Sequence, residues 1–497
     1  MAVGASVCAT IVADYKWSLR GLLGDEYEKA QHNVHERSAD RLQRLCFANG
    51  GIYIKLGQHI AQLDHLLPEE YVLTMRRTML DQCPVSPYPE VARIVREDLG
   101  STPEELFATF EHEPIASASL AQVHRATSHD GRQLAVKVQH AGLRDSCTAD
   151  TLTVEFLVKT VHLLFPKFDY SWLVDQIKES LPQELDFSVE VANAERCRKN
   201  FSSKQSHVRG RVAVPEILHP LCSKRVLTME FVTGANVCDK AALARMGLKA
   251  SDVARLVSET FNEMIFIFGD IHCDPHAANM LIRKKHGKAE LVLLDHGLYK
   301  RITDDFRRQY AGLWRALVFG DAEGIKAHAA AMNAADSYKF FAGMLTMRPW
   351  DEVTRASADH LYLGSSPEER KMIQGYAAQF AREISDMLRR IPRPLLLLLK
   401  TNDCLRTVDA CLGQPVNSFM MTARECTRAL NEARMRERPG LRMRAACLAD
   451  VIGVEARIAA LALMSWWSRQ NWRLFRRTSN RREAVQPPAL AMPRAVT

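Results

Sequence analysis

The chain has 497 residues, of which 47% are hydrophobic and 25% are charged, and its formal net charge is +8 at pH 7. This composition is typical of a globular protein with a real core, and the charge is too modest to indicate dedicated nucleic-acid binding. The 12 cysteines include no C-x-x-C pair, which argues against a zinc ribbon or a secreted disulfide scaffold and favours a reducing compartment.

The first hundred residues are expected to be mostly helical. Residues 3–13 are apolar without a preceding basic segment, so they could be a buried helix, a short membrane-contacting segment, or the result of a start site placed downstream of the true one. Residues 39–48 and 52–67 carry apolar side chains at three- and four-residue spacing, broken by Gly50-Gly51 and Pro68.

After residue 110 the pattern becomes that of strands. Residues 121–127 and 134–138 alternate in polarity and are joined across Asp130-Gly131, which predicts a hairpin because glycine accepts the positive φ of such turns. A long helical stretch at 145–200 and a strand at 225–232 follow.

The second half reads as a helical lobe. Residues 252–268 predict an amphipathic helix, residues 280–283 and 290–294 a second hairpin, and the chain beyond 303 further helices. This order predicts an α+β, two-lobed, protein-kinase-like fold with a nucleotide between the lobes. The expected divisions are an N-terminal helical extension at 1–109, the small lobe at 110–234, the large lobe at 235–435 and a helical, basic tail at 436–497.

Four side chains at ordered positions supply what phosphoryl transfer from ATP requires. Lys137 lies in the strand 134–138, from which its ammonium could reach the phosphates. Asp274 and Asn279 are five positions apart, as in the kinase loop H-R-D-x-x-x-x-N, so Asp274 would orient or deprotonate the acceptor and Asn279 would bind Mg²⁺. Asp295, which starts an Asp-His-Gly triplet after a strand, would be the second Mg²⁺ ligand.

Each of these features also has an ordinary structural explanation. Lys137 could be a solvated lysine on a strand, and Asp-His-Gly could be only a turn. His272 and His276 are four apart and could bind zinc, but Pro275 between them disfavours the helix that this spacing needs. The ordered set of four is far more specific than any one member.

The glycine-rich phosphate loop of kinases is missing. The segment before the lysine strand, residues 114–124, has alanine and serine where kinases place glycine. Backbone amides could still face a phosphate there, but methyl groups restrict the conformations and the approach of the loop.

With these motifs the chain resembles the UbiB family of atypical kinases, the aarF-domain-containing kinases, over residues 45–300 and more loosely to 430. The matching motifs are K-x-G-Q at Lys55-Leu-Gly-Gln58, the alanine-rich loop 116–121, Lys137, E-x-D at Glu184-Leu-Asp186, Glu190, His272-Cys-Asp-Pro-His276 with Asn279, and Asp295-His-Gly297. The D-H-G triplet is similar to that of the animal and plant branch. Ala277-Ala278 departs from the family, which usually has Pro-Gly there.

The resemblance implies roles for further residues. Lys55 and Gln58 would lie on an added helix that covers the peptide site of a protein kinase, and Glu184 and Asp186 would face that helix and could pair with Lys55. Glu190 would pair with Lys137, with Glu184 as the alternative. The ATP-binding residues implied are Ile115, Ala116, Ser117, Ala118, Ser119, Leu120, Ala121, Val123, Lys137, Glu190, Glu230 and Val232, the last two through backbone groups at adenine.

The resemblance also implies a function. It indicates an ATP- and Mg²⁺-dependent kinase or ATPase of prenyl-lipid or coenzyme Q metabolism, in a mitochondrion or plastid and associated with a membrane. A catalytically silent nucleotide-binding scaffold is the alternative, and a conventional protein kinase is a third. Residues 458–475 carry three tryptophans and precede a run of arginines, which suits either an anionic membrane interface or a packed helix with a basic tail. Nothing points to particular protein partners.

Overall fold

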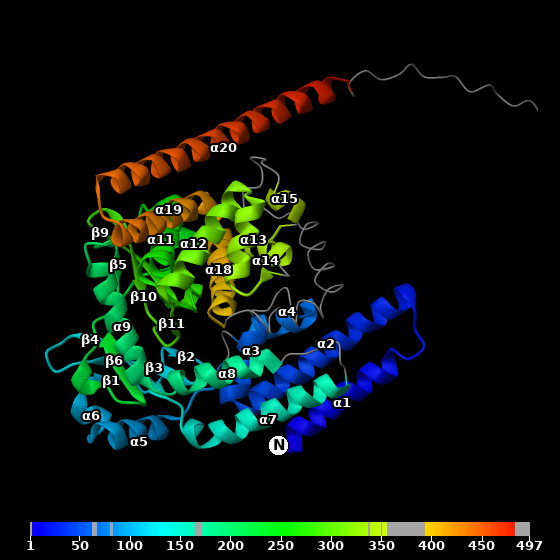
Figure 1. Ribbon diagram of the computed structural model, residues 1–497. Helices are drawn as coiled ribbons and strands as arrows, with labels where there is room; N and C mark the ends of the chain where they lie inside the picture. Colours follow the sequence, from blue (N-terminus) through cyan, green and yellow to red (C-terminus); the bar gives the residue numbers. More distant parts are fainter. Residues whose placement is uncertain are drawn as a thin grey trace, which may run out of the picture.

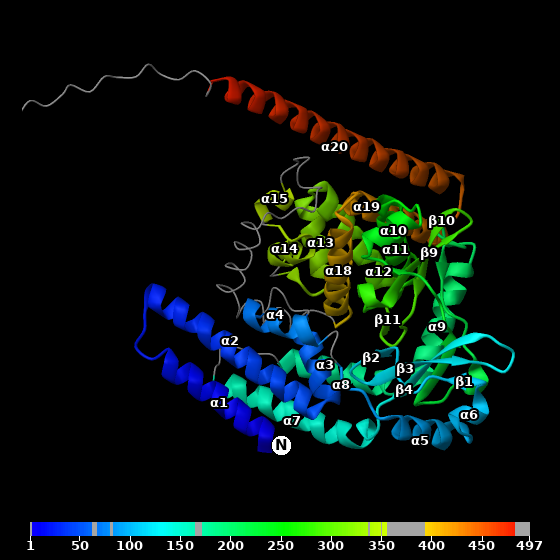
Figure 2. The same cartoon turned by 180° about the vertical axis from the view of Figure 1, so that it is seen from behind.

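The computed structural model describes residues 2–61, 67–79, 83–164, 171–335, 338–348, 350–354 and 393–482, and the side chains within these ranges up to residue 463 except those of residues 2, 3, 5, 171–173 and 176. Its elements form an N-terminal layer of helices, a small lobe around a five-stranded sheet, a large and mainly helical lobe, and one long C-terminal helix (Figure 1; Figure 2 shows the reverse side). The fold is α+β and two-lobed, as the sequence predicts.

Four helices make up the N-terminal layer. They are α1 (Ala2–Ser18), α2 (Gly24–Asn49), α3 (Gly51–Ile60) and α4 (Glu69–Thr78). The predicted break between α2 and α3 is confirmed: Gly50 and Gly51 have φ of +67° and +46°, which residues with a Cβ rarely adopt. Residues 3–13 lie in α1, where most of the described side chains are half-buried or exposed, and Asp14 holds this helix on α2 through Arg37 (2.8 Å) and Arg41.

The small lobe positions Lys137. Its sheet has the order β1-β3-β4-β6, with β2 also on β3, and packs on α5 (Tyr88–Leu99) beside α6 (Pro103–Leu106). The strands are β1 (Thr109–Phe110), β2 (Ala116–Ser117), β3 (Ala121–Thr127), β4 (Gln133–Gln139) and β6 (Val226–Glu230). Val136 and Val138 are fully buried toward α5. The alternation of a strand therefore turns Lys137 to the opposite face.

The long helical stretch expected at 145–200 is divided into three helices. They are α7 (Leu143–Leu164), α8 (Ser171–Glu184) and α9 (Phe187–Ser202). The second division has a local cause, because the Asp186 carboxylate caps α9 by accepting from the backbone N–H of Ser188 at 3.0 Å.

The large lobe contains two sheets. One has the order β5-β10-β9-β7, and the other pairs β8 with β11. The strands are β5 (Val212–Ala213), β7 (Ala235–Asn236), β8 (Asp270–His272), β9 (Met280–Lys285), β10 (Lys288–Leu293) and β11 (Tyr299–Arg301). The predicted second hairpin is β9–β10, and its turn uses positive φ at His286 and Gly287.

The helix expected at 252–268 changes its type within that range. It begins as α11 (Ala250–Asn262), after the short α10 (Lys240–Arg245), and continues as a π-helix, η2 (Glu263–Phe268). Buried Glu263, at the start of the π-helix, accepts from Ser206 Oγ and His207 N at 2.7 Å each. Wide turns of this kind are frequent beside functional loops, and β8 with the loop that contains Asp274 and Asn279 follows directly.

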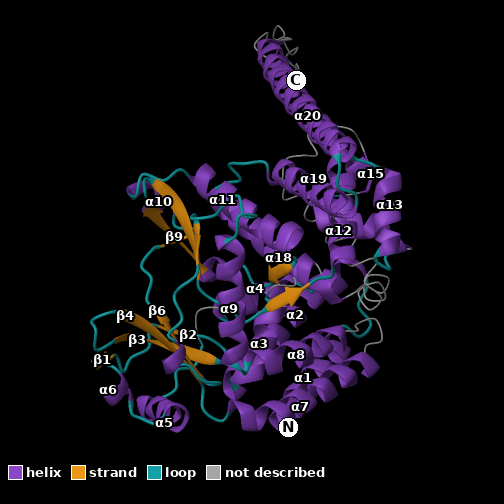
Figure 3. Ribbon diagram, turned by 60° about the vertical axis from the view of Figure 1, so that its left-hand side comes forward, coloured by secondary structure: helices purple, strands orange, loops and turns teal. Residues whose placement is uncertain are grey.

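The C-terminal part of the large lobe is helical. Its helices are α12 (Asp304–Phe319), α13 (Ala322–Ala331), α14 (Tyr338–Thr346), α15 (Trp350–Thr354), α18 (Arg393–Leu412), α19 (Ser418–Glu437) and α20 (Leu441–Arg482). The run of leucines at 395–399 lies in α18, where Leu395 and Leu398 are fully buried. Helix α20 extends beyond the body of the lobe (Figure 3). The tryptophan side chains of α20 lie outside the described side chains.

Cysteine spacing does not indicate the one disulfide among the described cysteines. Cys238, between β7 and α10, is bonded to Cys411 near the end of α18, 173 residues away. The other described cysteines are free thiols, five of them buried. None of the described helices has the length and apolarity needed to cross a bilayer.

Candidate active site

Lys137 lies between two carboxylates at the face of the small lobe that looks toward the large lobe. Its Nζ is 2.9 Å from Oε2 of Glu190, on α9, and 3.2 Å from Oδ2 of Asp295, which follows β10. We call these three residues the Lys137 cluster. Lys137 and Asp295 are more than 150 positions apart in the sequence and come from different lobes, so the two lobes meet at this cluster.

The charges of this cluster support one another. Burial disfavours the ammonium of Lys137, but Asp295 and Glu190 outweigh it and raise the pKa of Lys137 above its usual range. Burial also disfavours the carboxylate of Asp295, yet Lys137 and the backbone N–H of Gly297 lower the pKa of Asp295 to about 2. Both groups are therefore charged at neutral pH, and Asp295, 39% exposed, can face a cation in the cleft.

The two residues after Asp295 fix its orientation. The backbone N–H of Gly297 donates to Oδ1 of Asp295 at 2.8 Å, and a Cβ at this glycine would come within 3.2 Å of the same oxygen. His296 turns the other way: it is 2% exposed, and its ring contacts Tyr299 Oη at 2.9 Å and the Leu293 carbonyl at 3.2 Å. The histidine of the D-H-G triplet thus packs in the core and does not face the cleft.

The loop that contains Asp274 and Asn279 adjoins the segment that leads to Asp295. Asn279 ends a short 3₁₀ turn, η3 (Ala277–Asn279), and its carbonyl accepts from the N–H of Leu294 at 3.0 Å. Its Nδ2 donates to the backbone carbonyl of Asp274 at 3.2 Å, so Oδ1 is the atom of the amide that could ligate a metal. A carboxylate and an amide oxygen on adjoining segments suit a hard cation such as Mg²⁺.

Asp274 has two basic neighbours, one of which the sequence analysis did not identify. Its Oδ1 lies 3.0 Å from Nε2 of His276 and 3.2 Å from Nζ of Lys400, on α18. We call these three residues the Asp274 cluster. Burial would raise the pKa of Asp274, but Lys400, His276 and also Lys55 hold it well below its usual range. Lys400 follows a run of leucines 126 positions after Asp274, and no local motif marks it.

The geometry disfavours a zinc site formed by His272 and His276. His272 is fully buried, and its Nδ1 accepts from the N–H of Asp274 at 3.1 Å. Among the described residues, donor atoms of Asp274, His276 and Cys404 do lie within 4.8 Å of one another, which a softer metal ion could use. Such an ion would have to displace the Lys400 ammonium from Asp274.

The two acidic residues of the E-x-D motif, Glu184 and Asp186, have different partners. Lys55, on α3, forms an ion pair with Glu184 at 2.6 Å, and both side chains are at most 13% exposed. Asp274 and Asp295 also raise the pKa of Lys55, although burial opposes this, so α3 brings its lysine to the cleft. Asp186 does not pair with Lys55, because it caps α9. Gln58 donates to the Met79 carbonyl at 3.1 Å, which ties α3 to the end of α4.

The alanine-rich loop forms a tight turn. Ala118 N–H donates to the Ala121 carbonyl at 2.7 Å, and Ile115 N–H donates to the Val123 carbonyl at 2.8 Å. The members of the turn differ in exposure. Ile115, Ala116 and Ala118 are exposed, Ser117 and Val123 are half-buried, and Ser119, Leu120 and Ala121 are buried. The buried side chain of Leu120 packs into the core of the N-terminal layer, so only its backbone could contact a nucleotide.

The strand expected to bind adenine lies at the edge of the cleft. Glu230 ends β6, and its N–H donates to the Glu216 carbonyl at 2.8 Å, so it can contact adenine only through its own carbonyl. Val232 follows in the connection to β7 and is half-buried.

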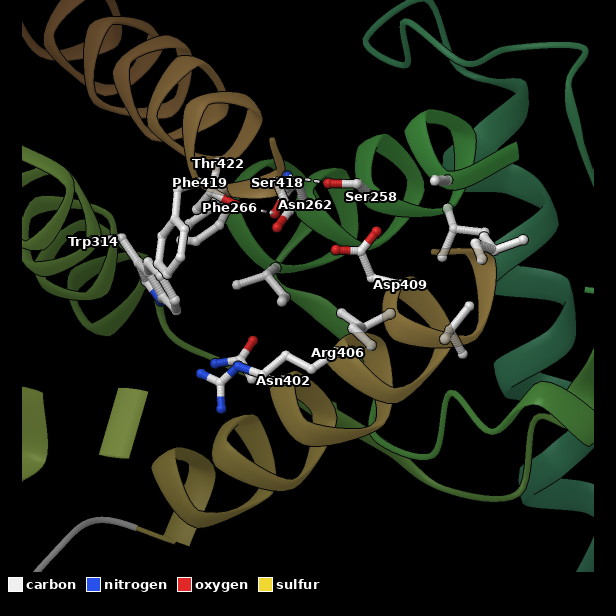
Figure 4. A pocket seen from close by; sticks show the side chains of 16 residues that line it. Ser258, Asn262, Phe266, Trp314, Asn402, Arg406, Asp409, Ser418, Phe419 and Thr422 are labelled. Carbon is white, nitrogen blue, oxygen red and sulfur yellow. Dashed lines mark hydrogen bonds between the residues drawn. The ribbon is translucent and has the colours of Figure 1, made fainter. Parts of the chain in front are cut away.

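A partly open cavity of about 80 Å³ lies away from these residues, between α11, α18 and α19 (Figure 4). Aromatic rings of Phe266, Trp314 and Phe419 close one side, and Asp409 points in from α18. Burial raises the pKa of Asp409 to about 6. This cavity contains none of the predicted site residues.

Comparison with known proteins gives concordant results. The model of a family described as the ABC1 atypical kinase-like domain matches residues 78–329, about half of the chain. A putative ABC1 protein of Arabidopsis thaliana is 47% identical over 472 residues, which cover 92% of this chain and 88% of the relative. AarF domain-containing protein kinase 1 of Mus musculus is 43% identical over 449 residues, covering 88% and 83%.

A solved structure is similar at a greater distance. A Mycobacterium tuberculosis protein in complex with erythromycin aligns with 79% of this chain and 99% of its own, at 21% identity and a TM-score of 0.44.

Proposed function

Because this chain belongs to the ABC1 family of atypical, AarF-domain kinases, we propose that it binds ATP with Mg²⁺ between its lobes and transfers or hydrolyses the γ-phosphoryl group. The observation that carries the proposal is the Lys137 cluster, in which Nζ lies 2.9 Å from Glu190 and 3.2 Å from Asp295. An ammonium held by one carboxylate can bind phosphate oxygens while the other carboxylate holds the metal.

Each part of the cleft then has a task. Lys137 binds the α- and β-phosphates, and the exposed backbone of the alanine-rich loop covers them. Asn279 Oδ1 and Asp295 hold Mg²⁺, which supplies positive charge to the phosphates when bound. Asp274 accepts the proton of the attacking hydroxyl or water. The Glu230 carbonyl and the backbone of Val232 bind adenine.

The acceptor is a small or lipid-associated molecule rather than a peptide. Lys55 and Glu184, paired at 2.6 Å and at most 13% exposed, hold α3 over the acceptor side of the cleft. The resemblance to the UbiB kinases supports a role in prenyl-lipid or coenzyme Q metabolism, in a mitochondrion or plastid and at a membrane surface.

Mg²⁺-dependent ATP turnover by the full-length chain, with and without lipid vesicles, tests this proposal. Asp295→Asn removes a metal ligand, so turnover should fall at least ~100-fold, the typical effect of removing one group that stabilises transition-state charge. Asp305→Asn, at a carboxylate that is 75% exposed on α12, is the matched control and should leave turnover unchanged. Turnover that survives Asp295→Asn would refute the assignment.

A nucleotide-binding scaffold without catalysis is the second candidate. It is favoured by the buried Ser119 and Leu120 at the turn where kinases have mobile glycines. The same experiment separates the two: wild-type protein that binds ATP with Mg²⁺ in calorimetry, yet turns over none under any lipid condition, is a scaffold.

A further inference from the structure

Lys400 differs from the other two lysines of the cleft in its ion-pair partner. Its Nζ lies 3.2 Å from Oδ1 of Asp274, and its side chain is 12% exposed. Among the described residues, Asp274 is the single carboxylate within ion-pair distance of Lys400. Lys137 and Lys55 differ, because each has a carboxylate other than Asp274, namely Glu190 and Glu184.

Helix α18, which carries Lys400, is anchored on two of its sides. Leu395, Leu398 and Thr401 are fully buried in or beside the core of the large lobe. On the side of the cavity between α11, α18 and α19, Nδ2 of Asn402 donates to Tyr310 Oη at 3.0 Å, and Arg406 donates to the Leu345 carbonyl (Figure 4 shows both side chains along α18). The lysine is therefore carried by a rigid element, as a group that must meet a substrate atom requires.

The position of this lysine explains what it is for. The attacking oxygen must lie within hydrogen-bond reach of Asp274 and in line with the γ-phosphorus, so the γ-phosphoryl oxygens come close to the Asp274 side chain. An ammonium that lies 3.2 Å from Oδ1 of Asp274 is placed to meet those oxygens. The phosphoryl group in transfer is the anion that arrives beside Asp274.

We infer that Lys400 is a second phosphate-binding ammonium of the active site, which contacts the γ-phosphoryl group of ATP from the Asp274 side while Lys137 holds the α- and β-phosphates. The inference rests on the proposed function and deepens it. Lys400 lies outside residues 78–329, so the kinase-like domain alone lacks this contact, and the C-terminal helices complete the site.

In the transfer step, the acceptor oxygen forms a bond to the γ-phosphorus while the bond from that phosphorus to the bridging oxygen of ADP breaks. The electron pair of the broken bond leaves with ADP. The acceptor proton passes to Asp274, through Oδ2, because Oδ1 faces His276 and Lys400. Lys400 neutralises charge on the γ-phosphoryl oxygens throughout, and with water as acceptor the products are ADP and inorganic phosphate.

Nucleotide affinity with and without a γ-phosphate tests the inference independently of turnover. Calorimetry with Mg²⁺ gives the dissociation constants of ADP and of the non-hydrolysable analogue AMP-PNP for wild type, Lys400→Met and Lys400→Arg. Lys400→Met should weaken AMP-PNP binding ~10-fold and leave ADP binding within about twofold, and Lys400→Arg should restore most of the loss. Thr407→Met, at an exposed position of the same helix, controls for disturbance of α18.

Two results would overturn the inference. Equal weakening of ADP and AMP-PNP in Lys400→Met would show a structural role only, and unchanged binding of both would show no contact with the γ-phosphate. If wild-type protein binds neither nucleotide, the proposed function itself fails, and that outcome is visible before any variant is made.

Discussion

The Lys137 cluster and the Asp274 cluster differ in where their residues come from and in how their charges balance. The first takes its members from β4, α9 and the end of β10, and it pairs one ammonium with two carboxylates. The second takes Lys400 from α18 and places two basic side chains beside one carboxylate. The kinase-like core thus builds the end of the cleft to which we assign the metal and the nucleotide, whereas a helix outside that core contributes to the end that we assign to the acceptor.

Breaking the Lys137 cluster should have the largest effect on stability. Lys137→Met leaves Glu190, whose side chain is 5% exposed, without a counter-charge. Removing one partner of a buried pair typically costs ~3–5 kcal/mol, and we expect a loss of that order in equilibrium denaturation. Lys137→Met/Glu190→Gln should recover part of the loss, since no unpaired buried charge is left.

The pH dependence of the same variant distinguishes an unpaired charge from lost packing. Burial raises the pKa of Glu190, and removing Lys137 removes the main opposing influence. The folded state then binds a proton more tightly than the unfolded state, so the deficit should be smallest near pH 5 and grow as the pH rises through the folded pKa. A deficit that does not change between pH 5 and pH 8 would contradict this explanation.

The acceptor end can be disturbed without touching Asp274. Glu184→Gln leaves the ammonium of Lys55 without its partner at 2.6 Å, and we expect a loss of ~1–3 kcal/mol on unfolding. Asp274 and Asp295 already act on Lys55, so the released lysine should compete with Mg²⁺ at Asp295. The Mg²⁺ concentration for half-maximal nucleotide binding should therefore rise.

Two controls make that prediction sharp. Lys55→Met/Glu184→Gln removes the competing ammonium and should return the Mg²⁺ requirement to that of wild type. Glu195→Gln, on the surface of α9 where the Arg198 pair is about one-third exposed, should change stability by less than ~1 kcal/mol. A Mg²⁺ requirement that is equal in Glu184→Gln and wild type would show that Lys55 does not reach the metal site.

The same contrast explains what the sequence could predict. Lys137, Asp274, Asn279 and Asp295 are marked by local signals: an alternating strand, a five-residue spacing, and a strand followed by Asp-His-Gly. The two lobes and both hairpins also follow from local periodicity and turn glycines. The expectation that Asp186 could pair with Lys55 rested only on its place in the E-x-D motif. In the structure Asp186 caps α9 instead, because aspartate is strongly preferred at helix N-caps.

Long-range contacts account for the rest. The contact between Lys400 and Asp274 depends on how α18 packs in the large lobe, and the Cys238–Cys411 disulfide joins the same helix to the region before α10. Neither is encoded in spacing, because the chain between the partners can take many paths. The π-helical end of α11 is similarly invisible, since its residues continue the same apolar pattern as an α-helix.

The smallest predicted effect is that of Asp409→Asn, on the side of α18 that lines the cavity. This variant tests whether α18 transmits a disturbance to the Asp274 cluster. Asp409 has a buried Oδ2 without a hydrogen-bond partner among the described residues, and burial raises its pKa to about 6. A raised folded pKa means that stability is lost as the pH rises through about 6. Asp409→Asn should therefore be more stable than wild type at pH 8, by ~1 kcal/mol after allowance for its partial exposure, and equal to it near pH 4.

Turnover of ATP by Asp409→Asn should not change, because Asn402 and Arg406 still anchor α18. A stabilised variant with altered ATP turnover would instead show that the cavity and the acceptor end are coupled through α18.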